Sequence, residues 1–122
     1  MIESIVGVTI WTNNLDQLTS FYKDTLGLTI HSMHRDFVTF QFGEMRLNLG
    51  LHSQVKGKNK DPYRIMAHLG TNDIHAVYEQ LSRRDVRFIR APERESWGGW
   101  VGTFLDPDGN ILQILQQPYL EE

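Results

Sequence analysis

The chain has 122 residues, a formal net charge of −3 and no cysteine. This length suits one domain with one sizeable core, and the acidic balance disfavours a nucleic-acid or anionic-membrane partner. The lack of cysteine excludes disulfides, thiolate metal sites and a cysteine nucleophile. No apolar run reaches the roughly 18 residues of a membrane span, and the N-terminus has no secretory signal pattern. We therefore expect a cytoplasmic protein with no membrane partner.

The first half of the chain begins with a predicted strand and a predicted helix. Apolar residues alternate with period two over residues 5–11, which indicates a strand with one apolar face. Helical spacing of apolar residues follows. Asn14 is placed to cap the start of this helix, Gln17 completes a capping-box pattern, and Gly27 is placed to end it. Three further strands are predicted over residues 28–33, 34–42 and 45–52.

The second half repeats this order after a polar, basic segment at residues 52–62. Asp73 is placed to cap a second helix, and Asp85 to take the left-handed conformation at its end. Strands are predicted on either side of this helix, over residues 64–70, 86–89, 100–105 and 111–116. The chain therefore repeats a β-α-β-β-β unit. We predict module one over about residues 1–53 and module two over about residues 62–122, within a single domain because each half alone is small.

Each predicted strand has one apolar face and one mixed face. We expect the apolar faces to pack against the two helices, which is an α+β arrangement. The mixed faces would then line a shared concavity, which we call the cup. Apolar walls with a few placed polar groups are typical of a small-molecule site.

Two motifs carry a resemblance to a known family: LDQLTSFYKDTLGL after the first strand and FLDPDGNILQIL near the end. With the repeat, they make the chain similar to the vicinal oxygen chelate superfamily, which includes glyoxalase I, bleomycin-resistance proteins and extradiol dioxygenases. The resemblance implies two tandem β-α-β-β-β modules forming a curled mixed sheet around a cup. It also implies helices on the outer face and a homodimer.

In the enzymes of this superfamily the cup holds a divalent metal bound by His or Glu. The resemblance places the four ligand positions at Gly7, Asn48, Met66 and Gln113. Glycine has no ligating side chain, neutral amides are weak ligands, and a thioether suits few divalent ions. A register shift by two gives Thr9, Gly50, His68 and Leu115, which is no better. We therefore expect neither the family metal site nor another cofactor.

The residues that we expect to contact a ligand in the cup are Trp11, Phe37, Arg46, Asn48, Met66, His68, Trp97, Trp100 and Gln113. Arg46 is a candidate anchor for a carboxylate or phosphate, and the alternative is an ion pair with Glu44 or Glu95. His68 is a candidate hydrogen-bond donor or general base, and the alternative is a half-buried histidine held by a neighbour. The two C-terminal tryptophans serve either the cup wall or the dimer interface.

The sequence favours a homodimer that binds a small organic molecule without a catalytic metal, in sequestration or resistance. Two alternatives stay open. One is a lyase, isomerase or dioxygenase of the same superfamily that uses a non-standard metal site or His68 as base. The other is a structural or partner-binding dimer whose cup is filled by its own side chains.

Overall fold

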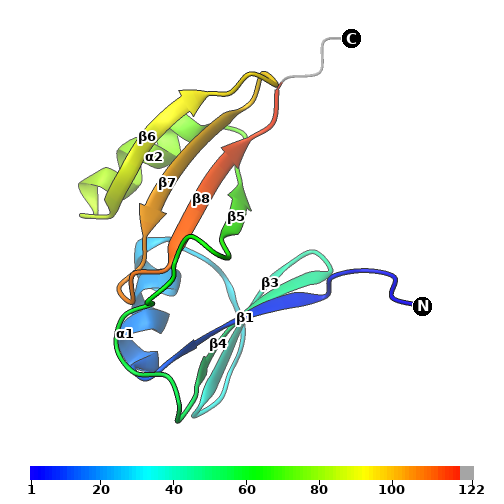
Figure 1. Cartoon of the computed structure of the whole chain (residues 1–122), viewed down its shortest axis with the longest axis vertical. Coiled ribbons are helices and arrows are strands. Elements are labelled where there is room, and N and C mark those ends of the chain that lie inside the picture. The colour runs from blue at the N-terminus through cyan, green and yellow to red at the C-terminus, as the bar shows by residue number, and fades with distance from the viewer. Residues whose placement is uncertain (119–122) are drawn as a thin grey trace. The chain divides into compact units, whose positions relative to one another are not determined.

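The computed structural model describes residues 1–118. The chain forms two compact units, Met1–Lys58 and Asn59–Glu122, each built from a four-stranded sheet and a helix (Figure 1). The division falls inside residues 52–62, the segment predicted to join the modules. The predicted end of the second module, at residue 122, lies outside the described residues. No helix in the described part of the chain is long and apolar enough to cross a membrane.

The first unit follows the predicted order of one strand, one helix and three strands. Its elements are β1 (Gly7–Thr12), α1 (Leu15–Ser20), η1 (Phe21–Thr25), β2 (Ile30–Met33), β3 (Phe37–Phe42) and β4 (Met45–Leu51). The strands lie in the order β1-β4-β3-β2, with β1 parallel to β4 and the other pairs antiparallel. The parallel pair joins strands that are far apart in the sequence, which the helix between them makes possible.

The start and end of the first helical segment are as predicted, but its interior differs. Asn14 Oδ1 accepts a hydrogen bond from the Gln17 backbone N–H at 3.3 Å, and Gly27 ends the segment with φ of 74°. Between them the α-helix gives way to the π-helical segment η1, in which the Leu26 N–H donates to the carbonyl of Phe21 at 2.9 Å. The prediction of one continuous α-helix was therefore wrong, because propensity and spacing carry no signal for a π turn.

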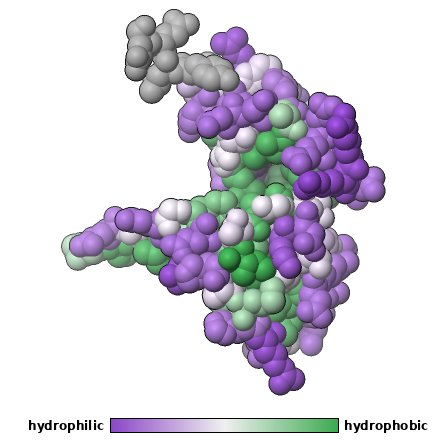
Figure 2. Space-filling view, turned by 180° about the vertical axis from the view of Figure 1, so that it is seen from behind, coloured by the Kyte–Doolittle hydropathy of each residue, from purple (hydrophilic) through white to green (hydrophobic). Residues whose placement is uncertain are grey.

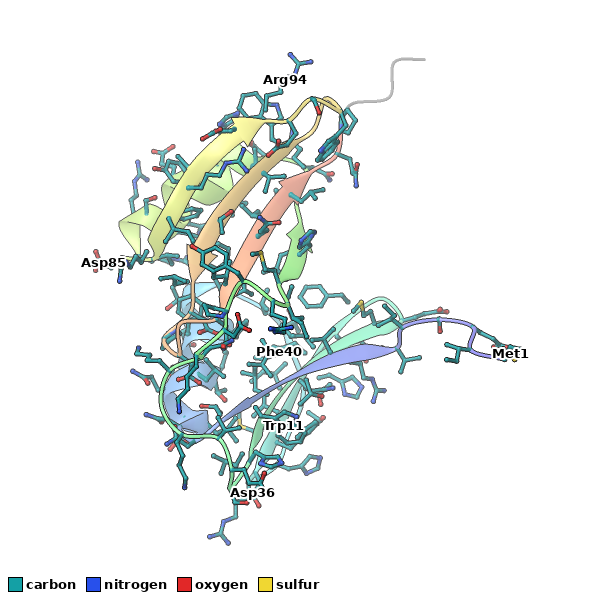
Figure 3. The ribbon with its side chains drawn as sticks, viewed as in Figure 1. Met1, Trp11, Asp36, Phe40, Asp85 and Arg94 are labelled. Atoms are coloured by element: carbon teal, nitrogen blue, oxygen red, sulfur yellow. The ribbon has the colours of Figure 1, made fainter. Side chains whose placement is uncertain are left out.

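The second unit repeats the arrangement. Its elements are β5 (Ala67–Gly70), α2 (Ile74–Arg83), β6 (Arg87–Arg94), β7 (Trp100–Leu105) and β8 (Ile111–Gln116), with the strand order β5-β8-β7-β6. Asp73 caps α2, because its Oδ1 accepts from the Ala76 N–H at 3.1 Å. Asp85 has φ of 63°, as predicted, at the turn between α2 and β6 (Figure 3).

Several strand boundaries differ from the prediction, those of β5 and β6 among them. β5 begins at Ala67 rather than near residue 64, and Ile65, which lies within the predicted strand, is 78% exposed. β6 extends to Arg94 rather than residue 89, and shifts in its pairing with β7 accompany this length. Such bulges let a strand continue past residues that break the period-two pattern.

Each unit has a core between its helix and one face of its sheet. In the first unit the fully buried residues include Leu18, Tyr22 and Phe40, and α1 packs on β4. In the second unit they include Ile74 and Phe104, and α2 packs on β6, β7 and β8. The helix covers one face of each sheet and leaves the opposite face for other contacts.

We expect Asp73→Ala to lower the free energy of unfolding by about 1 kcal/mol, because it removes the acceptor for the Ala76 N–H at the start of α2. Urea denaturation followed by circular dichroism measures this loss. The control is Asn72→Ala, an exposed neighbour outside the cap, which should change the unfolding free energy by less than half as much. Equal effects of the two substitutions would contradict the role of Asp73.

Candidate functional site

The face of the first sheet opposite α1 carries three rows of residues, and we call it the N-terminal open face. Strand register defines the rows as Gly7–Arg46–Gln41, Thr9–Asn48–Thr39 and Trp11–Gly50–Phe37. Four of the residues predicted to contact a ligand, namely Trp11, Phe37, Arg46 and Asn48, are therefore brought together on one surface. Successive rows are two residues apart, or about 7 Å along the strands.

The middle row is a hydrogen-bonded polar group. The Thr39 hydroxyl donates to Asn48 Oδ1 at 2.9 Å, and Asn48 Nδ2 donates to Thr9 Oγ1 at 3.3 Å. Both ends of the amide are therefore held by threonines on the neighbouring strands. This orientation leaves Asn48 less free to bond a ligand than the sequence suggested.

Aromatic rings form one end of this face. The Trp11 and Phe37 rings lie 6.0 Å apart, tilted at 52°, and a Cβ at Gly50 would lie 2.6 Å from Trp11 Cζ3 and 2.9 Å from Phe37 Cδ2. Gly50 therefore lets both rings close over the strand between them. Trp11 (Figure 3) still exposes 44% of its surface, so part of its ring is available to a ligand.

Gly50 and His52 also belong to this aromatic group, although neither was predicted to contact a ligand. The His52 ring meets Trp11 edge-on at 5.4 Å, and its Nδ1 accepts a hydrogen bond from the Gln54 N–H at 3.1 Å. Strand alternation already placed Gly50 and His52 on the same face as Asn48. The sequence could therefore show that both residues share this face. It could not show the ring contacts, because these depend on tertiary structure.

A cationic group forms the opposite end of the face. Arg46 is exposed, and its guanidinium forms no ion pair within the described residues 1–118. The alternative of an ion pair with Glu44 or Glu95 is therefore wrong. Glu95 instead accepts a hydrogen bond from Arg90 at 2.7 Å. A guanidinium without a protein partner is suited to bind a carboxylate or phosphate.

The second unit has a corresponding row of polar residues, the C-terminal open face, made up of His68, Gln113, Thr103 and Arg90. Gln113 Nε2 donates to Thr103 Oγ1 at 3.3 Å. His68 is exposed and lies next to Gln113 in the strand register.

Arg90 lies at one end of the C-terminal open face and is hydrogen-bonded to two carboxylates. It donates to Glu93 at 3.2 Å and to Glu95 at 2.7 Å. The hydrogen bond to Glu93 raises the pKa of Arg90 above its usual value, and the hydrogen bond to Glu95 raises it further. The guanidinium is already neutralised, so it is a weaker anchor for an anion than Arg46.

Trp100 does not lie on the C-terminal open face. Its ring meets His75 of α2 edge-on at 4.7 Å, and its register partner Gln116 accepts a hydrogen bond from the Ile74 N–H at 2.8 Å. The prediction that Trp100 lines the cup was wrong. In β7 the residues on the open face are Thr103 and its period-two neighbours, and Trp100 is one residue out of phase with them.

The two remaining candidates lie at the margins of the second sheet. Trp97 is 48% exposed in the turn between β6 and β7. Its ring covers Gly99, where a Cβ would lie only 1.8 Å from Trp97 Cζ3. Met66 is half-buried and precedes β5 rather than belonging to it. Neither residue lies within the row of Gln113.

The four positions of the family metal ligands do not fit a divalent metal. Gly7 has no side chain, both ends of the Asn48 amide are occupied, and the Gln113 amide donates to Thr103. Met66 offers only a thioether, a soft ligand that suits few divalent ions. Within residues 1–118 there is also no cluster of three or more His, Asp or Glu side chains that would hold a metal.

The model of the Glyoxalase/Bleomycin resistance protein/Dioxygenase superfamily matches residues 4–114. The chain belongs to this superfamily. It is 25% identical over 118 residues to a bleomycin resistance protein of Klebsiella pneumoniae, covering 89% of each chain. It is also 24% identical to the protein YraH of Bacillus subtilis, covering 90% of this chain and 95% of that one.

Solved structures of the superfamily have the same fold. A superfamily member from Sphaerobacter thermophilus matches with a TM-score of 0.75 and 26% identity, over 95% of this chain and 98% of that one. A glyoxalase-related enzyme from Fulvimarina pelagi matches with a TM-score of 0.76 and 16% identity, over 95% and 89%. The resemblance seen in the two sequence motifs is therefore confirmed as a family membership. Such a fold hosts many activities, so function has to be argued from the residues on its faces.

We expect Asn48→Leu to lower the free energy of unfolding by roughly 1–3 kcal/mol, because it leaves the buried Thr39 hydroxyl without its partner. Adding Thr39→Val to that variant should restore part of the loss, since only the half-buried Thr9 hydroxyl then stays without its former donor. Urea denaturation of both single variants and the double variant measures this coupling. Strictly additive losses would show that the two side chains do not depend on each other.

Proposed function

We propose that the protein binds a small organic molecule on its N-terminal open face without a catalytic metal, and that this binding serves sequestration or resistance. The observation that carries the proposal is the pairing of an exposed aromatic group with a guanidinium that has no ion-pair partner in residues 1–118, on one sheet face. Aromatic rings bind planar groups, and arginine binds carboxylates and phosphates. The favoured ligand is therefore an elongated aromatic anion.

The spacing of the two ends sets the length of this ligand. Arg46 and Gly50 are four residues apart on β4, which is about 13 Å between their Cα atoms in an extended strand. The long side chain of Arg46 shortens the gap that the ligand has to span. The Thr9–Asn48–Thr39 row lies between the two ends, and its hydrogen bonds make it a rigid floor rather than a third anchor.

Binding is favoured over catalysis for two reasons. The positions that the resemblance gives to the family metal ligands carry no imidazole or carboxylate, and neutral amides and a thioether are weak ligands for most divalent metals. His68, the candidate general base, donates no hydrogen bond from its ring to any side chain within the described residues, and such a bond is what usually orients a histidine base. The similarity to a bleomycin resistance protein supports a resistance role for this chain.

The ligand proposal predicts quenching of tryptophan fluorescence by aromatic carboxylates such as naphthoate derivatives. We expect Arg46→Gln to weaken binding by about tenfold or more, because a charged hydrogen bond contributes about 1.5–3 kcal/mol. The control is Arg94→Gln, at the end of β6 (Figure 3). Equal affinities of both variants, or quenching that persists in Trp11→Phe, would contradict binding on this face.

The proposal that the protein works without a catalytic metal predicts that purified, tag-free protein contains no stoichiometric transition metal by elemental analysis. Added Ni²⁺, Zn²⁺, Mn²⁺ or Fe²⁺ should leave the melting temperature unchanged. A metal that binds only the folded state at a hundred times its Kd would add roughly 2.7 kcal/mol, which a thermal melt detects. A stoichiometric metal would contradict the proposal and direct attention to lyase and dioxygenase activity.

We also propose that the protein forms a homodimer. The order β1-β4-β3-β2 leaves β1 at the edge of its sheet, and the segment before β1 exposes Ile2 by 95%, Ile5 by 74% and Val6 by 72%. Figure 2 shows hydrophobic surface along this N-terminal segment. An exposed apolar edge favours pairing with another chain.

The dimer proposal predicts a molecular mass of two chains by light scattering at micromolar concentration. Ile5→Lys should shift the protein towards the monomer, because it places a charge on the apolar edge. Glu3→Lys, a charge change in the same segment, should leave the dimer intact. A monomeric wild-type protein, or equal effects of the two variants, would contradict this interface.

A further inference from the structure

Gly50 of β4 lies between two aromatic residues of the N-terminal open face. It is the register partner of Trp11 on β1 and of Phe37 on β3. Its backbone does not have the positive φ that favours glycine. Glycine inside a strand lowers stability relative to alanine, so the backbone gives no reason for a glycine at this position.

The two rings beside Gly50 do give a reason. A Cβ at this residue would lie 2.6 Å from Trp11 Cζ3, 2.8 Å from Trp11 Cε3 and 2.9 Å from Phe37 Cδ2. Carbon atoms in contact lie about 3.5–4.0 Å apart, so both rings would have to move away from the strand by roughly 1 Å to admit a methyl group. The missing Cβ therefore sets how closely both rings approach β4.

Neighbouring rings also hold Trp11 in this position. Phe37 lies 6.0 Å from its ring, and His52, just after the end of β4, meets it edge-on at 5.4 Å. The His52 ring is itself held, because its Nδ1 accepts a hydrogen bond from the Gln54 N–H at 3.1 Å. Trp11 still exposes 44% of its surface, so its ring is fixed in place and yet open to a ligand.

A ligand that reaches from these rings to Arg46 has to lie along β4. On this face of the strand it passes Gly50 and then Asn48. Gly50 has no side chain, and the amide of Asn48 is held by hydrogen bonds to two threonines. A flat ring system can lie on this floor and contact the exposed Trp11 ring at the same time. A thicker, saturated ring system fits this path less closely.

We propose that Gly50 is a positioning residue that makes the N-terminal open face select flat, fused-ring anions over saturated anions with the same carbon skeleton. It acts through the rings of Trp11 and Phe37, since it has no side chain of its own. This inference rests on the function proposed above and specifies the ligand class more closely. It also explains why a glycine stands inside a strand where the backbone does not require one.

The test is calorimetric titration of the full chain with 2-naphthoate and with its fully saturated decalin analogue. The wild type should bind 2-naphthoate about threefold to tenfold more tightly, because contacts between aromatic rings add to the effect of the buried area. Gly50→Ala should lose most of this preference. The matched control is Gly70→Ala at the end of β5, where a Cβ would meet nothing within 4 Å. This control should keep the preference.

A second background separates positioning from folding. Trp11→Leu removes the ring nearest to the added Cβ, so the substitution can be tested there even if Gly50→Ala alone does not fold. In this background Gly50→Ala should lower the affinity for 2-naphthoate by less than in the wild type, because Gly50 then acts through Phe37 alone.

The outcomes distinguish this inference from the proposed function. Equal affinities of the wild type for the two anions, an unchanged preference in Gly50→Ala, or an equal loss in Gly70→Ala would overturn the role of Gly50 and leave the proposed anion site standing. An equal effect of Gly50→Ala with and without Trp11 would do the same. A wild type that does not bind 2-naphthoate would overturn both proposals.

Discussion

The packing of one helix against one face of each sheet is the constraint on which the rest of this structure depends. Tyr22 of η1 and Phe40 of β3 are fully buried against each other in the first unit, and Phe104 takes a similar place in the second. Period-two alternation then fixes every neighbouring residue on the opposite face. The open faces are therefore a direct consequence of which residues the helices bury.

The open faces of the two units share one arrangement, in which a threonine hydroxyl is hydrogen-bonded to a side-chain amide. Each has a threonine on its third strand that bonds an amide on its fourth, Thr39 with Asn48 and Thr103 with Gln113. A carboxylate at either position would carry a charge that needs a metal or a cation beside it. The neutral amides of Asn48 and Gln113 instead bond threonine hydroxyls on neighbouring strands, and these hydrogen bonds require no ion.

Helix-capping residues and the period-two alternation of apolar residues in strands predicted much of the fold, because each pattern depends on only a few neighbouring residues. Asn14, Asp73 and Asp85 take the roles that their side-chain chemistry predicted. The face of Trp100 was not predictable in this way, since it depends on the register of β7 against β8.

Each sheet has a helix-covered face and an open face, and this separation affects where substitutions are tolerated. The residues that stabilise each unit lie under the helix, whereas Arg46 and Trp11 lie on the open face and remain exposed. Under the proposed function, substitutions at these two positions would alter ligand binding at little cost in stability, as is usual for surface positions. Asn48 is the exception on this face, because it bonds two other strands. Substitutions are therefore expected to cost less stability at the two ends of the face than at its centre.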